Sequence, residues 1–191
     1  MNIIVIGGGA AGLMAAGTAA EQGANVTLFE TNEKVGRKLF ITGKGRCNVC
    51  NDCDAQEVLR NVPVNPRFLY SALGAFSPAD VKAFFEEKGV ALKTERGNRV
   101  FPVSDRASDI IDALFLWVRR TGVSIVHASV SDLVMQDGRV TGVRAGKANG
   151  LLRGSLRFLN FPLFSDCDTI RLGRKERGNS SLYKAISFHV Q

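Results

Sequence analysis

The first thirty residues alternate between apolar runs and small residues in a way that predicts a strand, a helix and a second strand. Residues 2–6, NIIVI, form an apolar, β-branched run that ends in three glycines, as a buried parallel strand does. Small and helix-favouring residues continue from Ala10 to Gly23, where the glycine predicts the end of a helix. Residues 25–29, NVTLF, predict a second strand that closes on Glu30.

The middle of the chain combines one long irregular segment with segments of clear period. Residues 31–54 have no clear hydrophobic period, and Gly36, Gly43 and Gly45 favour a long, functional loop there. The helices that follow have recognisable start and end signals, which are a proline at a helix start, an N-cap at Ser77 and helix-ending glycines. These signals predict two helices and two short strands, over residues 66–76, 77–89, 90–93 and 99–103.

A strong amphipathic segment then leads into a strand and a hairpin. Residues 105–121 place their apolar side chains, including Trp117 as a core residue, on one helical face, and Gly122 predicts the helix end. The turn QDGR separates two alternating runs, which is typical of a β-hairpin. The three strands predicted here cover residues 123–128, 130–135 and 140–145.

The composition is that of an ordinary globular protein whose positive charge is concentrated at the end. The 191 residues are 45% hydrophobic and 23% charged, which allows one domain and argues against disorder. The net charge is +7, and residues 147–191 hold eight basic and three acidic residues. Residues 1–146 are therefore nearly neutral, and we expect no nucleic acid as their partner.

Residues 147–191 have no sustained hydrophobic period, which sets them apart from residues 1–146. We interpret them as an atypical basic tail, either disordered or produced by a changed reading frame or a gene truncation near Gly146. The alternative is a genuine basic extension that contacts an anionic surface.

Three features predict a cytoplasmic location. No run reaches the roughly 18 apolar residues that a transmembrane helix needs. No basic segment precedes the first apolar run, so a secretory signal is not expected. Four cysteines in a chain that is not secreted indicate a reducing compartment.

Residues 7–12, GGGAAG, satisfy the G-x-G-x-x-G pattern of dinucleotide-binding proteins. The pattern alone is weak, but here it follows a predicted strand, opens a predicted helix at Ala10 and Ala11, and precedes an acidic residue at the end of the next strand. That acidic residue, Glu30, stands 18 residues after Gly12. The whole β-α-β fingerprint is therefore present, and a glycine-rich turn without a ligand becomes the less favoured interpretation.

Each part of the fingerprint has a physical role in binding a dinucleotide. Gly7 permits the tight turn, and Gly9 lets the backbone approach a pyrophosphate without an intervening Cβ. Gly12 and Ala16 allow the helix to pack close to the sheet, and its free N–H groups stabilise phosphates. Glu30 can accept hydrogen bonds from ribose hydroxyls and would repel a 2′-phosphate. These features predict a dinucleotide without distinguishing NAD from FAD.

The cysteine run in GKGRCNVCNDC, residues 43–53, raises the alternative of a metal site. A structural zinc or iron–sulfur site takes four ligands, and the fourth cysteine, Cys167, lies in the tail. His127 and His189 do not have zinc spacing. We therefore expect no metal and interpret the run as part of a cofactor loop.

Three segments together resemble one family: IIVIGGGAAGLMAA, GRKLFITGKGRCNVCN and ERGNRVFPVSDRASDIIDAL. They are similar to the N-terminal part of the BaiN-like (aminoacetone-oxidase-like) NAD(P)/FAD-dependent oxidoreductases, and the resemblance covers about residues 1–146. It implies an α/β Rossmann-type FAD-binding domain of the glutathione-reductase-like kind, with a β-hairpin or meander. The second and third segments are more specific than the glycine fingerprint.

The resemblance also implies which residues would contact FAD. Glycine-loop residues would lie at the pyrophosphate, Glu30 at the ribose, and basic residues of the GRK segment near the phosphates. Residues of the TGKGRCN segment would line FAD toward the flavin, and the backbone of Val130 would face the adenine edge. The predicted cofactor residues are Gly7, Gly9, Ala10, Ala11, Gly12, Glu30, Arg37, Lys38, Thr42, Gly43, Gly45, Arg46, Cys47, Asn48 and Val130.

Family members continue beyond this length with an A-T-G-G strand, a substrate domain and a late glycine–aspartate segment, and this chain contains none of them. The predicted function is therefore that of an incomplete FAD-dependent oxidoreductase, which transfers hydride between NAD(P)H and an unidentified small organic substrate. The alternative is a non-catalytic dinucleotide-binding remnant. An NAD-binding dehydrogenase is disfavoured because it does not need the long GRKLFITGKGRCN loop.

For several side chains the sequence allows two roles. His127 is expected to pack in its strand, with an acid–base role as the alternative. Cys47 is expected to provide packing or backbone contact, and a redox thiol beside the flavin is the alternative. Arg96 and Arg106 are interpreted equally as active-site residues or solvated charges.

Overall fold

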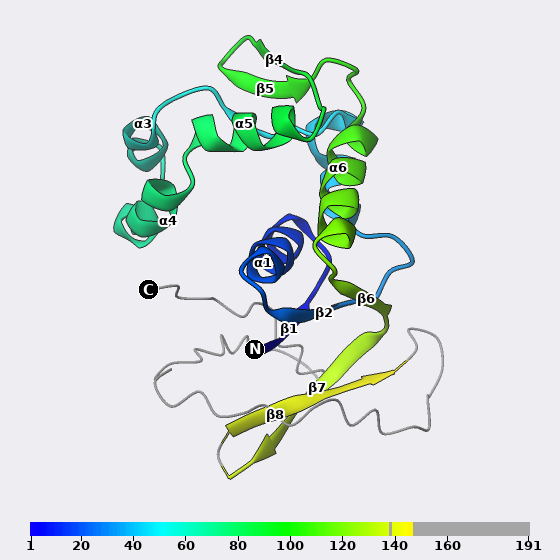
Figure 1. Cartoon of the computed structure of the whole chain (residues 1–191). Coiled ribbons are helices and arrows are strands. Elements are labelled where there is room, and N and C mark those ends of the chain that lie inside the picture. The colour runs from blue at the N-terminus through cyan, green and yellow to red at the C-terminus, as the bar shows by residue number, and fades with distance from the viewer. Residues whose placement is uncertain (138, 147–191) are drawn as a thin grey trace, which may run out of the picture. The chain divides into compact units, whose positions relative to one another are not determined.

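The computed structural model describes residues 1–137 and 139–146, and these fall into two compact units. The first unit comprises residues 1–35 and continues from Val118, and the second comprises residues 36–117 (Figure 1). The predictions for the basic tail, including Cys167 and His189, lie outside the described residues.

The first unit is built on a parallel sheet in which β2 is the central strand, in the order β1-β2-β6. Both pairings are parallel, from Asn2↔Asn25 between β1 and β2 to Glu30↔His127 between β2 and β6. The apolar run of β2 buries Val26, Leu28 and Phe29, because a central strand is covered on both faces. The elements are β1 (Asn2–Ile6), α1 (Ala10–Glu21), β2 (Asn25–Glu30) and β6 (Ser124–His127).

Helix α1 connects β1 to β2 and packs on both strands. Its buried residues are Leu13, Ala16 and Gly17, so small side chains form most of the packed face and allow close approach. The helix ends as predicted, with Gly23 at a φ of +84° and its N–H donating to the carbonyl of Ala20 at 2.9 Å.

A hairpin of β7 (Ser129–Gln136) and β8 (Arg139–Gly146) follows β6 in the same unit. Its inner face shares a buried cluster with the sheet, made of Phe29, Ala128, Val143 and Ala145, and Val130 packs against that cluster. Two register shifts interrupt the pairing, one of them between Val130 and Asp132. The hairpin thus covers apolar surface of the parallel sheet near the end of β2.

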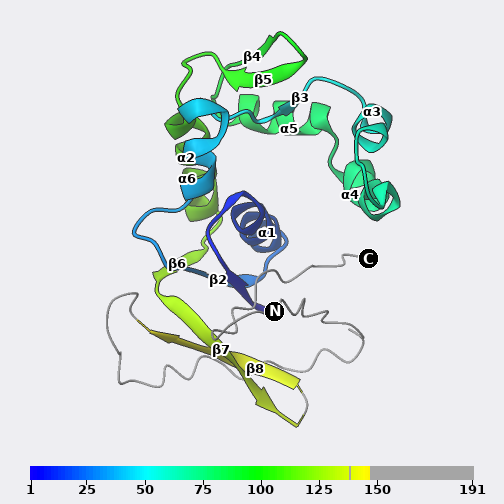
Figure 2. The ribbon, with the colours of Figure 1, turned by 180° about the vertical axis from the view of Figure 1, so that it is seen from behind.

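The second unit contains short helices around a three-stranded antiparallel sheet of order β3-β5-β4 (Figure 2). Strand β5 is central and buries Val100 and Phe101. The elements are α2 (Arg37–Ile41), η1 (Thr42–Gly45), β3 (Cys50–Asn51), α3 (Ala55–Arg60), η2 (Pro66–Leu69), α4 (Tyr70–Ala75), α5 (Pro78–Glu87), β4 (Leu92–Glu95), β5 (Arg99–Pro102) and α6 (Ala107–Arg120).

The sequence signals at α5 act as expected. Ser77 and Asp80 form a capping box, in which the Ser77 Oγ accepts from the Asp80 N–H and the Asp80 carboxylate accepts from the Ser77 N–H at 2.8 Å. The ring of Phe84 on this helix stands edge-on to Trp117 of α6, with centroids 4.9 Å apart. Trp117 is buried, which confirms its predicted core position.

Helix α6 has 14 residues, fewer than the roughly 20 that span a bilayer. Throughout the described parts of the chain, no helix combines the length and hydrophobicity needed to cross a membrane.

Most predicted elements are confirmed, but the long loop over residues 31–54 is a wrong prediction. That segment contains α2, η1 and β3, which are too short to produce a recognisable hydrophobic period. Helix α3 was not predicted, although Asp54 caps it by accepting a hydrogen bond from the Glu57 N–H at 2.7 Å. The predicted strand at 90–93 begins two residues later, at Leu92.

We predict that Ser77→Ala lowers the free energy of unfolding of the second unit by about 1 kcal/mol, because it removes one half of the capping box. Trp117, the single tryptophan, reports on this unit, so urea unfolding followed by its fluorescence measures the effect. Ser71→Ala, at an exposed position in α4, is the matched control. Equal effects of the two substitutions would contradict the prediction.

Candidate functional site

The glycine loop between β1 and α1 has a backbone that few other residues could adopt. Gly7 has a φ of +102°, and its N–H donates to the carbonyl of Phe29 at 2.7 Å, which joins the loop to β2. A Cβ on Gly12 would lie 1.8 Å from the carbonyl oxygen of Gly7. The third glycine of the fingerprint is therefore required by the close approach of α1 to the loop.

The N-terminus of α1 is open to a ligand. Gly9 is its N-cap residue and has extended backbone, and no side chain of the described residues caps the helix. A Cβ on Gly9 would meet no atom of the described residues within 4 Å, and Ala10 and Ala11 are exposed. The first turn contains no acidic side chain, so its N–H groups present positive potential to an anion.

The carboxylate of Glu30 lies at the base of this loop and is only 8% exposed. One oxygen accepts from the N–H of Gly8 at 2.7 Å. The other accepts from the N–H of Asn32 at 2.7 Å and from its side-chain amide at 2.6 Å. Two carboxylate oxygens offer about four acceptor positions, so these contacts leave capacity for hydroxyl donors of a ribose.

His127 ends β6 beside Glu30 and is exposed, so the expectation that it packs within the strand is wrong. Its Nδ1 lies 2.8 Å from the backbone carbonyl oxygen of Asn32. Because a carbonyl oxygen can only accept a hydrogen bond, Nδ1 carries a proton and donates it. His127, Asn32, Glu30 and Gly8 thus form one hydrogen-bonded series at the carboxyl ends of the three parallel strands, the edge at which ligands bind in such sheets.

In the second unit, the TGKGRCN loop (residues 42–48) has an unusual backbone. Gly43, Lys44, Gly45 and Cys47 all have positive φ values, between +56° and +86°. A Cβ on Gly43 would lie 2.9 Å from both the Asn48 backbone nitrogen and the ring of Phe101. Position 43 therefore requires glycine for two reasons, its positive φ and the lack of space for a Cβ.

The three described cysteines are free thiols, and Cys47 alone of them is buried. Cys47 is 1% exposed, and burial raises its pKa. Burial likewise raises the pKa of Cys50 to about 11, although the neighbouring Lys82 opposes that change. Both thiols therefore stay protonated at neutral pH, which disfavours nucleophilic attack by a thiolate. Over residues 1–137 and 139–146, no three His, Cys, Asp or Glu side chains form a group suited to a metal ion.

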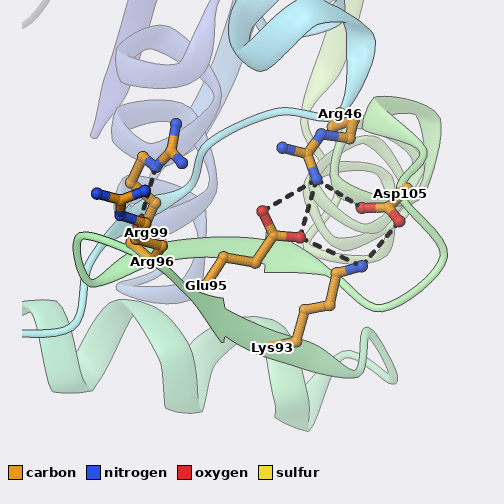
Figure 3. A network of polar contacts seen from close by, with 6 residues as sticks. All are labelled: Arg46, Lys93, Glu95, Arg96, Arg99 and Asp105. Carbon is orange, nitrogen blue, oxygen red and sulfur yellow. Dashed lines mark hydrogen bonds and ion pairs between the residues drawn. The ribbon is translucent and has the colours of Figure 1, made fainter.

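Arg46 is held by carboxylates from β4 and from the turn after β5 (Figure 3). Its Nη1 donates to both oxygens of Glu95, at 2.9 and 3.1 Å, and to Asp105 at 3.1 Å. Lys93 completes a ring by pairing with Asp105 at 2.7 Å and with Glu95 at 3.5 Å. The hydrogen bond from Arg46 is the main cause that lowers the pKa of Glu95, and that from Lys93 lowers the pKa of Asp105.

The remaining predicted residues occupy defined places. Arg37 and Lys38 are exposed in the first turn of α2, and Thr42 donates to the carbonyl of Leu39 at 2.9 Å. Asn48 can turn its amide nitrogen toward the carbonyl oxygens of Val100 and Cys50, at 3.2 and 3.1 Å. Arg96 and Arg106 are also exposed, and Arg106 pairs with Asp109 at 3.4 Å.

The structure gathers the predicted residues into two groups and adds contacts that the sequence analysis missed. One group, around the glycine loop, belongs to the first unit, and the other, from Arg37 to Asn48, belongs to the second. The missed residues are Gly8 and Asn32 beside Glu30, and Glu95 and Asp105 beside Arg46. The run of three glycines was the only signal for Gly8, and no local pattern marks the others.

We predict that Gly12→Ala lowers the free energy of unfolding by roughly 2 kcal/mol more than Gly9→Ala does, because only the first Cβ collides with backbone. Thermal unfolding followed by far-ultraviolet circular dichroism compares the two. Equal stability of both variants would mean that α1 is free to move away from the loop.

Comparison with known proteins identifies a family that this chain matches. The model of the HI0933-like protein Rossmann domain matches residues 1–155, which is most of the chain. The 3-dehydro-bile acid delta(4,6)-reductase of Clostridium scindens is 36% identical over 128 residues, covering 65% of this chain and 31% of the relative. The ribosomal RNA dihydrouridine synthase of Haemophilus influenzae is 33% identical over 127 residues, covering 66% of this chain and 31% of the relative. The chain thus spans about a third of the length of these curated relatives.

Solved structures share the fold at low sequence identity. THI4 of Thermovibrio ammonificans superimposes with a TM-score of 0.54 and 17% identity, covering 77% of this chain and 47% of that one. The 3-ketosteroid-delta4-(5alpha)-dehydrogenase of Rhodococcus jostii RHA1 gives a TM-score of 0.52 and 19% identity, covering 75% of this chain and 41% of that one. The predicted α/β Rossmann-type fold is confirmed, and so is the predicted resemblance to the BaiN-like family. The chain belongs to the HI0933-like Rossmann domain family.

Proposed function

We propose that this chain binds FAD and that its β-α-β unit holds the adenosine–pyrophosphate half. The observation that carries the proposal is the buried Glu30 carboxylate, bonded to Gly8 beside an uncapped helix N-terminus. A carboxylate for the ribose and free N–H groups for the phosphates are the two contacts that this half of the cofactor needs. The space around Gly9 fits the close approach of a pyrophosphate.

Each residue of the proposed site has a separate role. Gly9 lets the pyrophosphate reach the backbone, and the N–H groups of Ala10, Ala11 and Gly12 donate to it. Glu30 accepts from the ribose hydroxyls and disfavours a 2′-phosphate. The backbone of Val130 is assigned to the adenine edge.

The same proposal assigns the residues of the second unit to the remainder of FAD. Exposed basic side chains of α2 supply positive charge for the phosphates, and the TGKGRCN loop supplies backbone and side-chain contacts toward the flavin. The residues involved are Arg37, Lys38, Thr42, Gly43, Gly45, Arg46, Cys47 and Asn48.

Bound FAD would accept a hydride from NAD(P)H and pass it to a substrate. The residues of this chain bind and orient the cofactor, and the complete activity is proposed for a protein of the relatives' length. Such a protein is proposed to be cytoplasmic, because its free cysteines suit a reducing compartment.

The proposed substrate is a small organic molecule with a reducible double bond. The relative from Clostridium scindens is named as a reductase of a bile acid, which is a small molecule. RNA is a second candidate substrate, because the relatives from Haemophilus influenzae and Escherichia coli are named as ribosomal RNA dihydrouridine synthases. The near-neutral body of the chain favours the small molecule.

We predict that the 191-residue chain binds FAD and that Gly9→Ala weakens this binding by about tenfold or more, because the added Cβ occupies the path of the pyrophosphate. Isothermal titration with FAD measures both affinities. Thr18→Ala, at an exposed position farther along α1, is the control and should bind as the unmodified chain does. Equal affinity of all three proteins, or no heat of binding for any, would refute the proposed site.

A second prediction separates an oxidoreductase from a binding module. If the chain supports hydride transfer, anaerobic NADPH or NADH bleaches the visible absorption of the FAD-loaded protein faster than that of free FAD. Bound FAD that is reduced no faster than free FAD would favour the alternative function, a non-catalytic dinucleotide-binding protein.

A further inference from the structure

We propose that strand β4 and the turn after β5 fix the conformation of the TGKGRCN loop through Arg46, which makes Glu95 and Asp105 positioning residues for the FAD site. This inference rests on the proposed function, because it assigns a purpose to a loop that is proposed to contact FAD. All of the residues involved belong to the second unit.

The first observation is a closed ring of ion pairs in which Arg46 is one of four members (Figure 3). Positive and negative side chains alternate around the ring, and its four contacts measure 2.9, 3.5, 2.7 and 3.1 Å. They come from three segments, the loop, strand β4 and the turn after β5, where Asp105 has a φ of +57°. Isolated surface ion pairs contribute little, but a network that joins three segments restricts each of them.

The second observation is that the ring of Phe101 packs against two residues of the loop. The guanidinium carbon of Arg46 lies 4.0 Å from the centroid of the Phe101 ring, within cation–π range. The same ring lies 2.9 Å from the Cβ position of Gly43. Phe101 is 1% exposed in the central strand of its sheet, so two loop residues rest on a fixed surface.

The third observation is that the backbone of the loop is unfavourable and needs contacts that maintain it. Lys44 and Cys47 are non-glycine residues with φ values of +59° and +61°. Backbone hydrogen bonds span the loop, from the Arg46 N–H to the carbonyls of Gly43, at 3.3 Å, and of Thr42, and from the Cys47 N–H to the carbonyl of Thr42 at 3.1 Å. The bond to Gly43 is long, and the side chain of Arg46 adds contacts that attach the middle of the loop to β4 and to Asp105.

The end of the loop is attached to β5 by backbone pairing. The Val49 N–H donates to the carbonyl of Val100 at 2.8 Å, and Cys50 pairs with Val100 in the sheet. The loop is therefore anchored twice, by backbone pairing with β5 and by ion pairs with β4 and Asp105. If the charge anchor is lost, the middle of the loop can leave its left-handed conformation while the end stays in place.

Limited proteolysis of the 191-residue chain tests the anchor without a cofactor. Trypsin cleaves after Lys44 and Arg46, both within the loop, and mass spectrometry identifies the fragments. We expect the double variant Glu95→Gln/Asp105→Asn to be cleaved roughly five- to tenfold faster at these two positions than the unmodified chain. Cleavage after Arg60, in α3, is the internal reference and should stay within about twofold.

Two matched variants complete the experiment. Asp112→Asn removes an exposed carboxylate of α6 outside the ring and should leave loop cleavage unchanged. Glu95→Asp keeps the charge and should restore much of the protection. Unchanged loop cleavage in the double variant would overturn the proposal. Equal acceleration at Arg60 would also overturn it, because the whole unit would then have loosened.

Titration with FAD tests the positioning role separately. We expect the double variant to bind FAD about tenfold more weakly than the unmodified chain, because the loop must then be ordered upon binding. Faster loop cleavage with unchanged FAD affinity would refute positioning. If the unmodified chain binds no FAD, the proposed function fails, while the cleavage rates still decide whether the charge anchor exists.

Discussion

The contact between the Glu30 carboxylate and the Gly8 N–H is the interaction on which the first unit depends. It fixes the glycine loop to the end of β2, at 2.7 Å and out of solvent, beside the hydrogen bond from Gly7 to Phe29. A buried carboxylate is stable only when hydrogen bonds compensate its lost hydration, and here Gly8 and Asn32 provide them. The arrangement that stabilises the turn also orients a carboxylate and a helix N-terminus toward one ligand.

The order of the chain separates elements that must meet. Strands β2 and β6 pair in parallel from Thr27↔Ser124 to Glu30↔His127, although the whole second unit lies between them in the sequence. Closing such a long loop costs chain entropy, which the burial of apolar side chains on the central strand offsets. The hairpin β7–β8 adds to that burial through Val143 and Ala145 on Phe29. The site at the end of β2 thus depends on contacts formed across distant parts of the sequence.

The elements with strong local signals were predictable, and those that depend on tertiary contacts were not. The apolar run at 2–6, the N-cap at Ser77 and the helix-ending Gly23 and Gly122 each determine their structure within a few residues. The short elements within 31–54 have no such period, because Cys50 becomes a strand residue only by pairing with Val100. For the same reason the positions of Gly7, Gly12 and Glu30 were predictable from the fingerprint, whereas the partners of Arg46 were not.

The measurement that tests the central claim most directly is the visible absorption spectrum of the purified 191-residue chain after incubation with FAD and removal of the free cofactor. A two-banded flavin spectrum that remains with the protein is the predicted result, because Glu30, the glycine loop and the N-terminus of α1 offer the contacts that the adenosine–pyrophosphate half needs. A colourless protein would contradict the claim that this chain holds FAD. A broad brown absorption before incubation would contradict the interpretation of the cysteines as packed thiols.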